Sequence, residues 1–358
     1  MQMNGGINMD KINIKSRLYD YSVEFVNGIA LTDKDAAFVI DANVFRLYED
    51  KFSGIDRRKV YLMEAVESRK NMDTVMEIIT FWKNLGVKKN WIIYCFGGGI
   101  TQDVTTIASN LYLRNIEWQF FPTTLLAMCD SCIGGKCGIN LGQYKNQIGV
   151  FYPPKKIFID TGFLKTLTHQ DYLNGWGELL KFSLTGHPEF YADIKTLKQY
   201  IPCGEIAKYI HWGLNVKKEI IEADEFESDL RRVLNYGHTF GHALEAYTCN
   251  RIPHGEGVIW GIDVVNFIAY REGLTEYSTY GDIKAFIRRA FIPQEITIEN
   301  PGELFDIIST DKKVRGNVLS FAMPDGKGGL SVHPMEINTK LKEIFYEYLR
   351  TTHEYYSD

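Results

Sequence analysis

The sequence predicts an α/β domain followed by a mostly α-helical domain, and three features indicate this fold class. Up to about residue 160, short apolar runs typical of buried strands alternate with glycine-containing turns and helical patterns. From residue 161 onward, apolar residues recur almost throughout with the spacing of an α-helix. The length of 358 residues suits about two domains. We therefore expect an α/β domain over residues 1–160 and a helical domain over residues 161–358.

The composition is that of an ordinary globular protein, with 45% hydrophobic and 24% charged residues. A formal net charge of -5 argues against binding to nucleic acid or to an anionic membrane, so neither partner is expected. No apolar run reaches the ~20 residues that a membrane span needs, and no secretory signal is expected at the N-terminus. The six dispersed cysteines, including the Cys-x-x-Cys pair Cys129 and Cys132, are expected to be free thiols in a reducing cytoplasm.

Seven apolar runs of the first domain are expected to be strands. They are Lys11–Ile14, Tyr21–Phe25, Ala36–Asp41, Val60–Val66, Trp91–Phe96, Trp118–Phe121 and Lys156–Asp160. The run Ala36–Asp41 ends in an acid and is followed by Asn43. In open α/β sheets, polar residues at the carboxyl ends of strands contact ligands. A helical pattern opens at Glu67–Lys70 and runs to about Leu85.

A glycine loop follows the strand Trp91–Phe96 directly and reads Gly97-Gly98-Gly99-Ile-Thr-Gln-Asp103 before a helix that runs to about Tyr112. A strand, a glycine loop and a helix N-terminus bring backbone N–H groups against a pyrophosphate in Rossmann-like domains. The spacing is not Gly-x-Gly-x-x-Gly, so a plain tight turn explains the glycines equally well. Asp103, at the start of the helix, is either a helix-stabilising charge or a ligand contact.

Two polar turns follow the strand Trp118–Phe121. The first is glycine-rich and contains Asp130 and Lys136, and the second contains Lys145 and Asn146. Lysines on loops beside glycines are more typical of anion ligands than of solvated surface charges. These turns are therefore expected to contact an anionic group of a ligand.

The second domain is expected to be built from helices and one hairpin. The helices lie near residues 188–200, 204–222, 232–248, 256–272, 280–291, 302–310 and 338–349, with a helical turn at Glu178–Lys181 and a hairpin of Asn317–Ala322 with Gly329–His333. In the helix 232–248, His238 and His242 are four residues apart and share one face. Asn235, Arg231 and Glu227 fall roughly on the same stripe, whereas the opposite stripe is apolar. A solvated face is the alternative, but this polar stripe favours a functional site.

Three of the chain's eight histidines, His238, His242 and His254, lie within 17 residues. Neutral imidazole is the commonest nitrogen ligand of zinc. His238 and His254 can converge from neighbouring helices, and Glu178 is the best carboxylate for a third ligand. The spacing alone does not choose His238 with His254 over His238 with His242. One glutamate and two histidines with an open position are typical of a catalytic zinc site.

A nucleotide loop, a metal trio and at least five lysines or arginines together favour redox chemistry on a phosphorylated, polyhydroxylated substrate. The metal would polarise a hydroxyl or carbonyl group, NAD would accept a hydride, and the cations would hold phosphate and carboxylate groups. A cleft between the two domains is the expected place for such a site.

Seven motifs carry a resemblance to a known family. They are Gly97-Gly-Gly-x-x-x-Asp103, Pro122-Thr-Thr-Leu-Leu126, Asp130-Ser-x-x-Gly-Gly-Lys136, Lys145-Asn-x-x-Gly149, Gly177-Glu-x-x-Lys181, Leu234-Asn-x-Gly-His-x-x-Gly-His242 and His254-Gly-Glu256. With them the chain resembles the sugar-phosphate cyclases, most closely the 3-dehydroquinate synthase family, from about Asp41 to Lys313. The resemblance implies a Rossmann-like NAD-binding domain, a helical metal-binding domain and a homodimer. The chain departs from the family pattern at Gln102, where glycine is usual, and at Cys132 and Cys137.

The resemblance also implies roles for individual residues. The implied ligands of zinc, or of cobalt in its place, are Glu178, His238 and His254. The residues that match NAD contacts are Asp41, Asn43, Glu67, Lys70, Gly98, Gly99, Asp103, Thr123, Thr124, Lys145, Phe163, Thr166 and Leu167. The residues that match the substrate-binding and catalytic set are Asp130, Lys136, Asn146, Lys181, Lys217, Glu227, Arg231, Asn235, His242 and one of Lys312 and Lys313, of which we take Lys313.

The implied reaction converts a small-molecule substrate, 3-deoxy-arabino-heptulosonate 7-phosphate, into 3-dehydroquinate and phosphate. The implied steps are oxidation of a zinc-bound hydroxyl by NAD, phosphate elimination, re-reduction, ring opening and an intramolecular aldol closure, so NAD is not consumed. The shikimate pathway of aromatic amino acid biosynthesis is the implied context. Retention of Arg231, Asn235 and His242 favours this carboxylate-bearing substrate.

Three alternatives remain. Another cyclase, of the 2-deoxy-scyllo-inosose, valiolone or amino-dehydroquinate type, would belong to a secondary or surface-carbohydrate pathway, as the departures from the family pattern suggest. A metal-dependent polyol or glycerol-type dehydrogenase would share the architecture but would not need so many cations. A non-enzymatic binding module would need neither a metal nor a nucleotide.

Overall fold

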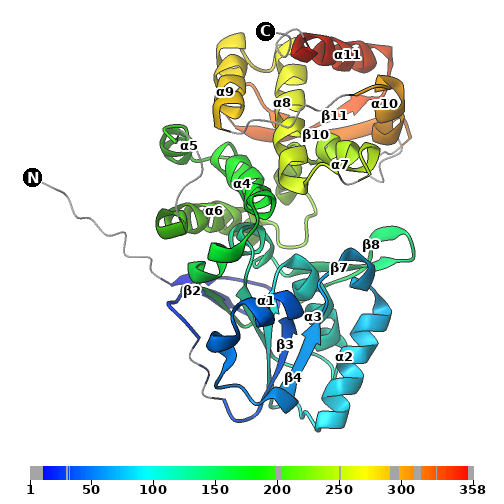
Figure 1. Cartoon of the computed structure of the whole chain (residues 1–358). Helices are drawn as coiled ribbons and strands as arrows, with labels where there is room; N and C mark the ends of the chain where they lie inside the picture. The colour runs from blue at the N-terminus through cyan, green and yellow to red at the C-terminus, as the bar shows by residue number, and fades with distance from the viewer. Residues whose placement is uncertain are drawn as a thin grey trace, which may run out of the picture. The chain divides into compact units, whose positions relative to one another are not determined.

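The computed structural model describes residues 11–29, 31, 33–197, 203–249, 251–290, 298–309, 316–327 and 329–353. The chain divides into two compact units, Met1–Gly175 with Pro202–Phe226, and Trp176–Ile201 with Glu227–Asp358 (Figure 1). Residues 161–175 and 202–226 thus lie with the first unit, beyond the expected domain end at residue 160. The reason is that the helix α6 (Cys203–Ala223) packs on the first strand and on two helical turns of the α/β unit.

A seven-stranded sheet forms the centre of the first unit, in the order β1-β2-β9-β6-β5-β3-β4. The strands are β1 (Ile12–Ile14), β2 (Tyr21–Phe25), β3 (Ala36–Asp41), β4 (Val60–Met63), β5 (Ile92–Gly97), β6 (Trp118–Pro122) and β9 (Lys156–Ile159). All neighbours pair in parallel except β1 and β2. The central strands β3, β5 and β6 are buried almost throughout, as expected for a parallel sheet with both faces covered. All seven predicted strands are therefore present, although β4 ends at Met63 rather than Val66.

The helices of this unit are α1 (Ala42–Leu47), α2 (Met72–Leu85), α3 (Gly99–Leu111) and α6, with short 3-10 helices at Glu49–Phe52, Arg57–Lys59, Glu67–Arg69 and Thr161–Thr166. The helix predicted to open at Glu67 begins instead at Met72. Asn71 has an extended backbone, and its side-chain oxygen accepts a hydrogen bond from the Thr74 N–H. Asn71 is thus the N-cap of α2 and separates it from the preceding 3-10 turn.

A two-stranded hairpin of β7 (Lys136–Leu141) and β8 (Tyr144–Phe151) was not predicted. It packs beside α2 and α3 (Figure 1), and a π-helical turn, Ala127–Ser131, precedes it. The sequence did not indicate these strands because β8 is largely exposed and polar at its start, and because Gly138 faces Gly149 across the hairpin. Lys136 and the second polar turn are therefore parts of one hairpin, whereas Asp130 lies on the π-helical turn before it.

Helices dominate the second unit, as predicted. They are α5 (Pro188–Ile194), α7 (His238–Tyr247), α8 (His254–Arg271), α9 (Tyr277–Ala290), α10 (Pro301–Ser309) and α11 (Thr339–His353), together with most of α4 (His169–Ser183) and a 3-10 helix, Leu230–Asn235. The hairpin of β10 (Val318–Pro324) and β11 (Leu330–Glu336) confirms the predicted hairpin. The helix α8 is buried on nearly all sides and is packed by α7, α9 and α11 (Figure 1). None of the helices in the described ranges has the length and apolarity needed to cross a membrane.

The single helix predicted over residues 232–248 is wrong. Gly237 has a left-handed backbone (φ 76°) and separates the 3-10 helix from α7, which begins at His238. A Cβ at Gly237 would lie 2.5 Å from the Val258 carbonyl oxygen, so only glycine fits where this break lies against α8. Arg231 and Asn235 lie on the 3-10 helix, and Glu227 precedes it with a positive φ of 59°. The predicted stripe therefore holds only for His238 and His242.

Candidate active site

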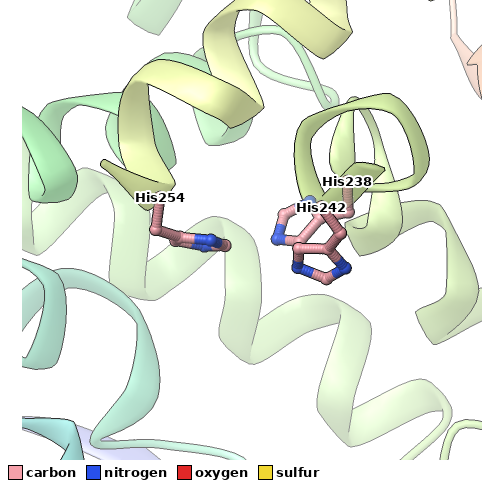
Figure 2. Close-up of side chains that lie close together, drawn as sticks. All are labelled: His238, His242 and His254. Atoms are coloured by element: carbon pink, nitrogen blue, oxygen red, sulfur yellow. The ribbon is translucent and has the colours of Figure 1, made fainter. Parts of the chain in front are cut away.

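Three imidazoles converge where α7 and α8 begin (Figure 2). One ring nitrogen each from His238, His242 and His254 lies within 4.8 Å of the others. His238 opens α7, His242 follows one turn later, and His254 opens α8. The sequence left open whether His242 or His254 accompanies His238, and the structure brings all three together.

Close backbone contacts explain why the two helix starts meet. A Cβ at Gly261 would lie 1.9 Å from the Gly237 carbonyl oxygen, and a Cβ at Gly241 would lie 2.7 Å from the Gly257 carbonyl oxygen. Only glycine leaves room for this approach of α7 and α8. In the Gly-His-x-x-Gly-His motif, the glycines therefore provide the helix contact, and the histidines face the space beside it.

Glu178 joins this cluster from α4. Its Oε1 lies 3.3 Å from His238 Nε2 and 3.1 Å from His254 Nε2, and its side chain is 1% exposed. A further glycine contact holds it there, because a Cβ at Gly177 would lie 2.4 Å from the Gly255 carbonyl oxygen. The other carboxylate oxygen of Glu178 accepts a hydrogen bond from Lys181 one turn later. The three residues expected to bind metal thus lie together, with His242 beside them.

Hydrogen bonds fix the orientation of two of these rings. The Nδ1 atom of His238 lies 3.1 Å from the Tyr236 carbonyl oxygen, and that of His254 lies 2.9 Å from Glu245 Oε1. These acceptors favour a hydrogen on Nδ1 of each ring, and the Nε2 atoms face Glu178. Histidines that bind metals are held in this way by an acceptor on the second nitrogen.

Charges in the cluster are strongly coupled. Burial alone would raise the pKa of Glu178, but Lys181 and His238 outweigh it and hold that pKa well below its usual range. Burial lowers the pKa of His238 below its ordinary value despite the nearby Glu178. Burial acts the same way on His254, but hydrogen bonds to Glu178 and Glu245 raise its pKa to about 10. Of these two rings, His254 is therefore the one that favours the protonated form.

This donor set fits a divalent transition metal. It offers one carboxylate oxygen and imidazole nitrogens with acceptors on the far side of the rings, which suits Zn²⁺ or Co²⁺. Since a metal binds neutral imidazole, loading would displace the proton of His254.

Glu245 was missed by the sequence reasoning, although its position was a usable signal. It lies seven residues after His238 and three after His242, so the three share one face of α7. Its carboxylate accepts the hydrogen of His254 Nδ1. We therefore expect Glu245→Ala to weaken zinc binding about 10-fold to 100-fold, and Glu245→Gln to weaken it less because the amide oxygen still accepts. Competition with a chromogenic zinc chelator at neutral pH measures this affinity.

The matched control is Glu303→Ala, at an exposed position in the first turn of α10. It should leave zinc binding unchanged. Wild-type affinity in Glu245→Ala would show that this hydrogen bond does not orient His254.

The glycine loop of the first unit lies between β5 and α3. Gly98 is the N-cap of α3 and forms no side-chain cap bond, and a Cβ there would lie 2.9 Å from Thr124 Cγ2. Beside it, the Thr123 hydroxyl is buried and has no hydrogen-bond partner among the described residues. A helix start with open N–H groups and a neighbouring buried hydroxyl suits the pyrophosphate of a dinucleotide.

The other expected cofactor residues lie in three places of the same unit: at the end of β3, around Lys70 and Asp103, and in the turn Thr161–Thr166. Asp41, at the end of β3, caps α1 by accepting from the Asn43 N–H at 2.8 Å, and burial raises its pKa. Lys70 Nζ lies 2.7 Å from Asp103 Oδ2 and donates to Asn146 Oδ1 at 2.8 Å. Burial raises the pKa of Asp103, while Lys70 opposes that shift.

The third place is the turn Thr161–Thr166, which includes Phe163 and ends just before Leu167. The Tyr48 hydroxyl donates to the Phe163 carbonyl oxygen and lies 2.9 Å from the Thr166 hydroxyl. Tyr48 was not singled out from the sequence. It links α1 to this turn, so Asn43 and Thr166 belong to one connected part of the unit.

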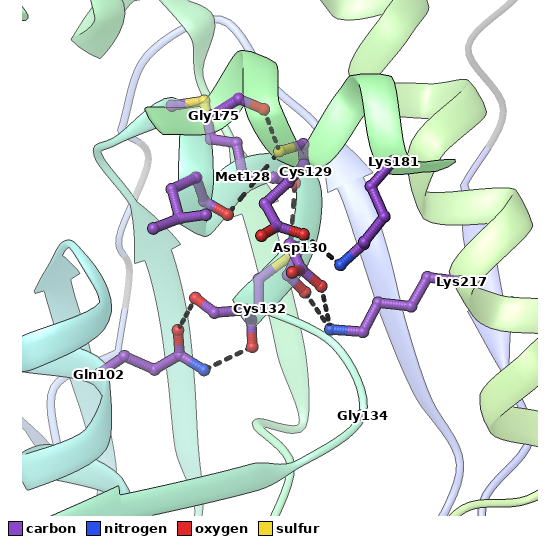
Figure 3. Close-up of polar contacts among 12 residues, drawn as sticks. Gln102, Met128, Cys129, Asp130, Cys132, Gly134, Gly175, Lys181 and Lys217 are labelled. Atoms are coloured by element: carbon purple, nitrogen blue, oxygen red, sulfur yellow. Dashed lines mark hydrogen bonds and ion pairs between the residues drawn. The ribbon is translucent and has the colours of Figure 1, made fainter. Parts of the chain in front are cut away.

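Hydrogen bonds from α3 and α6 hold the π-helical turn that bears Asp130 (Figure 3). Lys217 Nζ, from α6, donates to the Asp130 carbonyl oxygen at 2.6 Å and to its carboxylate. Gln102, from α3, donates to the Ser131 carbonyl oxygen at 2.7 Å and accepts from the Ser131 hydroxyl at 2.6 Å. The departure from the family pattern at Gln102 therefore has a structural role, since its buried amide fastens α3 to the turn.

The remaining expected substrate residues are placed as follows. Lys136 opens β7, and Lys145 and Asn146 lie in β8, all three exposed. In the second unit, Arg231 is buried, and Asn235 Nδ2 donates to Glu227 Oε1 at 3.1 Å. Lys312 and Lys313 lie outside the described residues.

Comparison with known proteins gives two matching families, described as "3-dehydroquinate synthase N-terminal" over residues 60–174 and "3-dehydroquinate synthase C-terminal" over residues 175–314. The 3-dehydroquinate synthase of Alkaliphilus metalliredigens is 33% identical over 318 residues, covering 86% of this chain and 89% of that protein. That of Campylobacter concisus is 30% identical over 345 residues, covering 95% and 98%.

Solved structures of related cyclases share the fold. The 2-epi-5-epi-valiolone synthase of Streptomyces hygroscopicus, with NAD⁺ and Zn²⁺ bound, has a TM-score of 0.78 at 26% identity, covering 93% of this chain and 97% of that one. A 2-deoxy-scyllo-inosose synthase complexed with carbaglucose-6-phosphate, NAD⁺ and Co²⁺ has a TM-score of 0.81 at 22% identity, covering 94% and 99%. The two-domain fold class predicted from the sequence is thus confirmed.

Proposed function

The chain belongs to the 3-dehydroquinate synthase family, and from this premise we propose that it converts 3-deoxy-arabino-heptulosonate 7-phosphate into 3-dehydroquinate and phosphate. The observation that carries the proposal is the donor set of Glu178, His238 and His254, with Lys181 beside it. Matching 3-dehydroquinate synthases over most of the chain support this substrate over that of a polyol dehydrogenase.

Zinc or cobalt held by Glu178, His238 and His254 would polarise a substrate hydroxyl, and NAD bound at the α3 N-terminus would accept and return a hydride. The residues around the cluster keep the donors ready for this role. Lys181 holds Glu178 ionised, and the acceptors behind His238 and His254 keep their Nε2 atoms directed inward. The expected metal ligands Glu178, His238 and His254 and the expected NAD contacts become, on this proposal, the cofactor-binding residues of the enzyme.

The lysines and arginines of the site are expected to bind the substrate, which carries both a phosphate and a carboxylate. Lys136 and Lys145, on the hairpin, are exposed lysines of the kind that bind phosphate as point charges. Arg231 is buried, and a guanidinium group matches the geometry of a carboxylate. We propose these roles together with the expected roles of Asp130, Asn146, Lys217, Glu227, Asn235, His242 and Lys313.

The proposed reaction needs no net redox change. One C–O bond to phosphate breaks, one C–C bond closes the carbocycle, and the hydride taken from the substrate returns to it. NAD is therefore expected to act catalytically, so that phosphate accumulates without NADH.

We also propose that the enzyme is a cytoplasmic homodimer. Among the cysteines with described side chains, Cys95, Cys129, Cys132 and Cys137 are buried free thiols and Cys249 is an exposed one, as suits a reducing compartment. Light scattering of the purified protein, with a dimer mass expected, tests the oligomeric state.

Phosphate release from purified protein tests the proposed function. The assay contains 3-deoxy-arabino-heptulosonate 7-phosphate, substoichiometric NAD and zinc, with and without a chelator. Metal-dependent phosphate release with 3-dehydroquinate formed and no NADH is the expected result. Activity only with sedoheptulose 7-phosphate or glucose 6-phosphate would indicate another cyclase, and stoichiometric NADH from a polyol would indicate a dehydrogenase.

A further inference from the structure

Asn140, in β7, lies where the hairpin meets the segment that leads into α2. The register between β7 and β8 shifts between Ile139 and Leu141, so Asn140 has no ladder partner in β8. Its backbone turns instead to the neighbouring segment, where it forms a bridge with Asn71 and its N–H donates to the Lys70 carbonyl oxygen at 2.8 Å. The irregularity in the hairpin thus aligns Asn140 with residues 67–71.

The side chain of Asn140 uses both ends of its amide for different segments. Its Oδ1 accepts from the Asn146 N–H at 2.9 Å, and its Nδ2 donates to Glu67 Oε1 at 2.8 Å. Asn146 has a positive φ of 53°, a conformation that costs free energy outside glycine and needs support from its surroundings. The hydrogen bond that Asn140 Oδ1 accepts from the Asn146 N–H supplies such support.

Lys70 closes the network. Its ammonium group donates to Asn146 Oδ1 at 2.8 Å and lies 2.7 Å from Asp103 Oδ2. Asn146 is therefore bonded to Asn140 through its backbone N–H and to Lys70 through its side chain. Asn140 also donates its own N–H to the Lys70 carbonyl oxygen. These contacts tie together three separate segments, at residues 67–70, 103 and 140–146.

We propose that Asn140 is a positioning residue that couples cofactor binding to substrate binding. This rests on the proposed function, which assigns Glu67, Lys70 and Asp103 to NAD and Asn146 to the substrate. On this proposal Asn140 acts through Glu67, Lys70 and Asn146, to which it bonds. Its side-chain Nδ2 positions Glu67, which is expected to bind NAD, and its Oδ1 positions the backbone of Asn146, which is expected to bind the substrate.

Two substitutions distinguish the role of the Asn140 Nδ2 donor from that of its Oδ1 acceptor. Asn140→Ala removes both, so the dissociation constant of NAD and the KM for the substrate are each expected to rise about fivefold to tenfold. Asn140→Asp keeps an oxygen for the Asn146 N–H but sets a carboxylate against Glu67. It is expected to weaken NAD binding about tenfold while KM, at saturating NAD, stays within about twofold. In both variants kcat is expected to stay within about twofold, because no bond of Asn140 reaches the metal cluster.

Hydrogen–deuterium exchange of the hairpin peptide 141–147 gives a readout that does not depend on the reaction. Exchange is expected to accelerate in Asn140→Ala and to remain as in the wild type in Asn140→Asp, which retains the acceptor. Gln147→Ala is the matched control, because Gln147 is exposed on the same hairpin and its side chain bonds only to the Lys145 carbonyl oxygen among the contacts of the described residues. It should change neither exchange nor binding.

The proposal fails if Asn140→Ala leaves NAD affinity, KM and exchange as in the wild type. It also fails if Asn140→Asp and Asn140→Ala change NAD binding and KM in the same proportion, because the two ends of the amide would then have no separate roles. A wild-type protein that neither binds NAD nor releases phosphate would overturn the proposed function instead, while the exchange experiment would still decide whether Asn140 positions Asn146.

Discussion

Glu178→Gln is expected to abolish metal retention and to lower phosphate release by about 10³-fold or more, because it removes the one carboxylate of the donor set. A second effect follows from the ion pair. Lys181 is 2% exposed, so the substitution breaks a buried ion pair. The free energy of unfolding of the metal-free protein should therefore fall by about 3–5 kcal/mol. Metal content after gel filtration, the phosphate assay and urea unfolding in the presence of a chelator measure the three effects.

Glu189→Gln is the control for this substitution. Glu189 lies exposed in the first turn of α5 and pairs with His187 at the surface. Its replacement should change neither metal content nor activity. Full metal retention by Glu178→Gln would contradict the assignment of this carboxylate as a ligand, and unchanged unfolding in chelator would contradict the role given to the ion pair.

Gly261→Ala is expected to have the second-largest effect. The new methyl group would lie 1.9 Å from the Gly237 carbonyl oxygen, so α7 and α8 must move apart. The free energy of unfolding should fall by about 3 kcal/mol. Because His238 and His254 open these two helices, zinc affinity should fall at least about tenfold even though no ligand is changed. Urea unfolding and chelator competition measure the two quantities.

A second glycine gives the matched comparison. Gly281 lies in α9, where a Cβ would meet only Tyr277 Cε1 at 3.8 Å. Gly281→Ala should leave zinc affinity unchanged and should stabilise the protein by about 0.4–1 kcal/mol, because alanine reduces the freedom of the unfolded chain. If Gly261→Ala behaved like Gly281→Ala, the close contact of α7 and α8 would not be what holds the histidines together.

The strands and helices were predictable where the local pattern of apolar residues agreed with the tertiary structure. Ala36–Asp41 and Trp91–Phe96 are continuous apolar runs, and both became central strands of the parallel sheet. The hairpin of β7 and β8 was not predictable in this way, because its residues are paired through backbone hydrogen bonds while much of β8 faces solvent. Period-two patterning requires one buried face, and β8 starts without one.

Candidate ligands were predictable by chemistry, and their arrangement was not. Histidines and a glutamate that suit a metal could be selected from the sequence. The local periodicity, however, predicted one continuous helix across Gly237, where the structure has a break. The left-handed backbone at Gly237 lies against Val258 and Ile262, which are more than twenty residues away in the chain. Glu245 and Asn140 were missed for a related reason, since each acts by orienting another residue and resembles no ligand by itself.

The glycine contacts of α4, α7 and α8 have a consequence for how this family can diversify. The helix segments that bear Glu178, His238 and His254 approach one another through close backbone contacts at Gly177, Gly237 and Gly261. Side chains on these helices that do not bond to the ligands, unlike Glu245 and Lys181, can therefore change without disturbing the metal site. Lineages could exchange the residues that select a sugar phosphate while inheriting the same metal chemistry, as long as the ligands, the residues that bond to them and these glycines are kept.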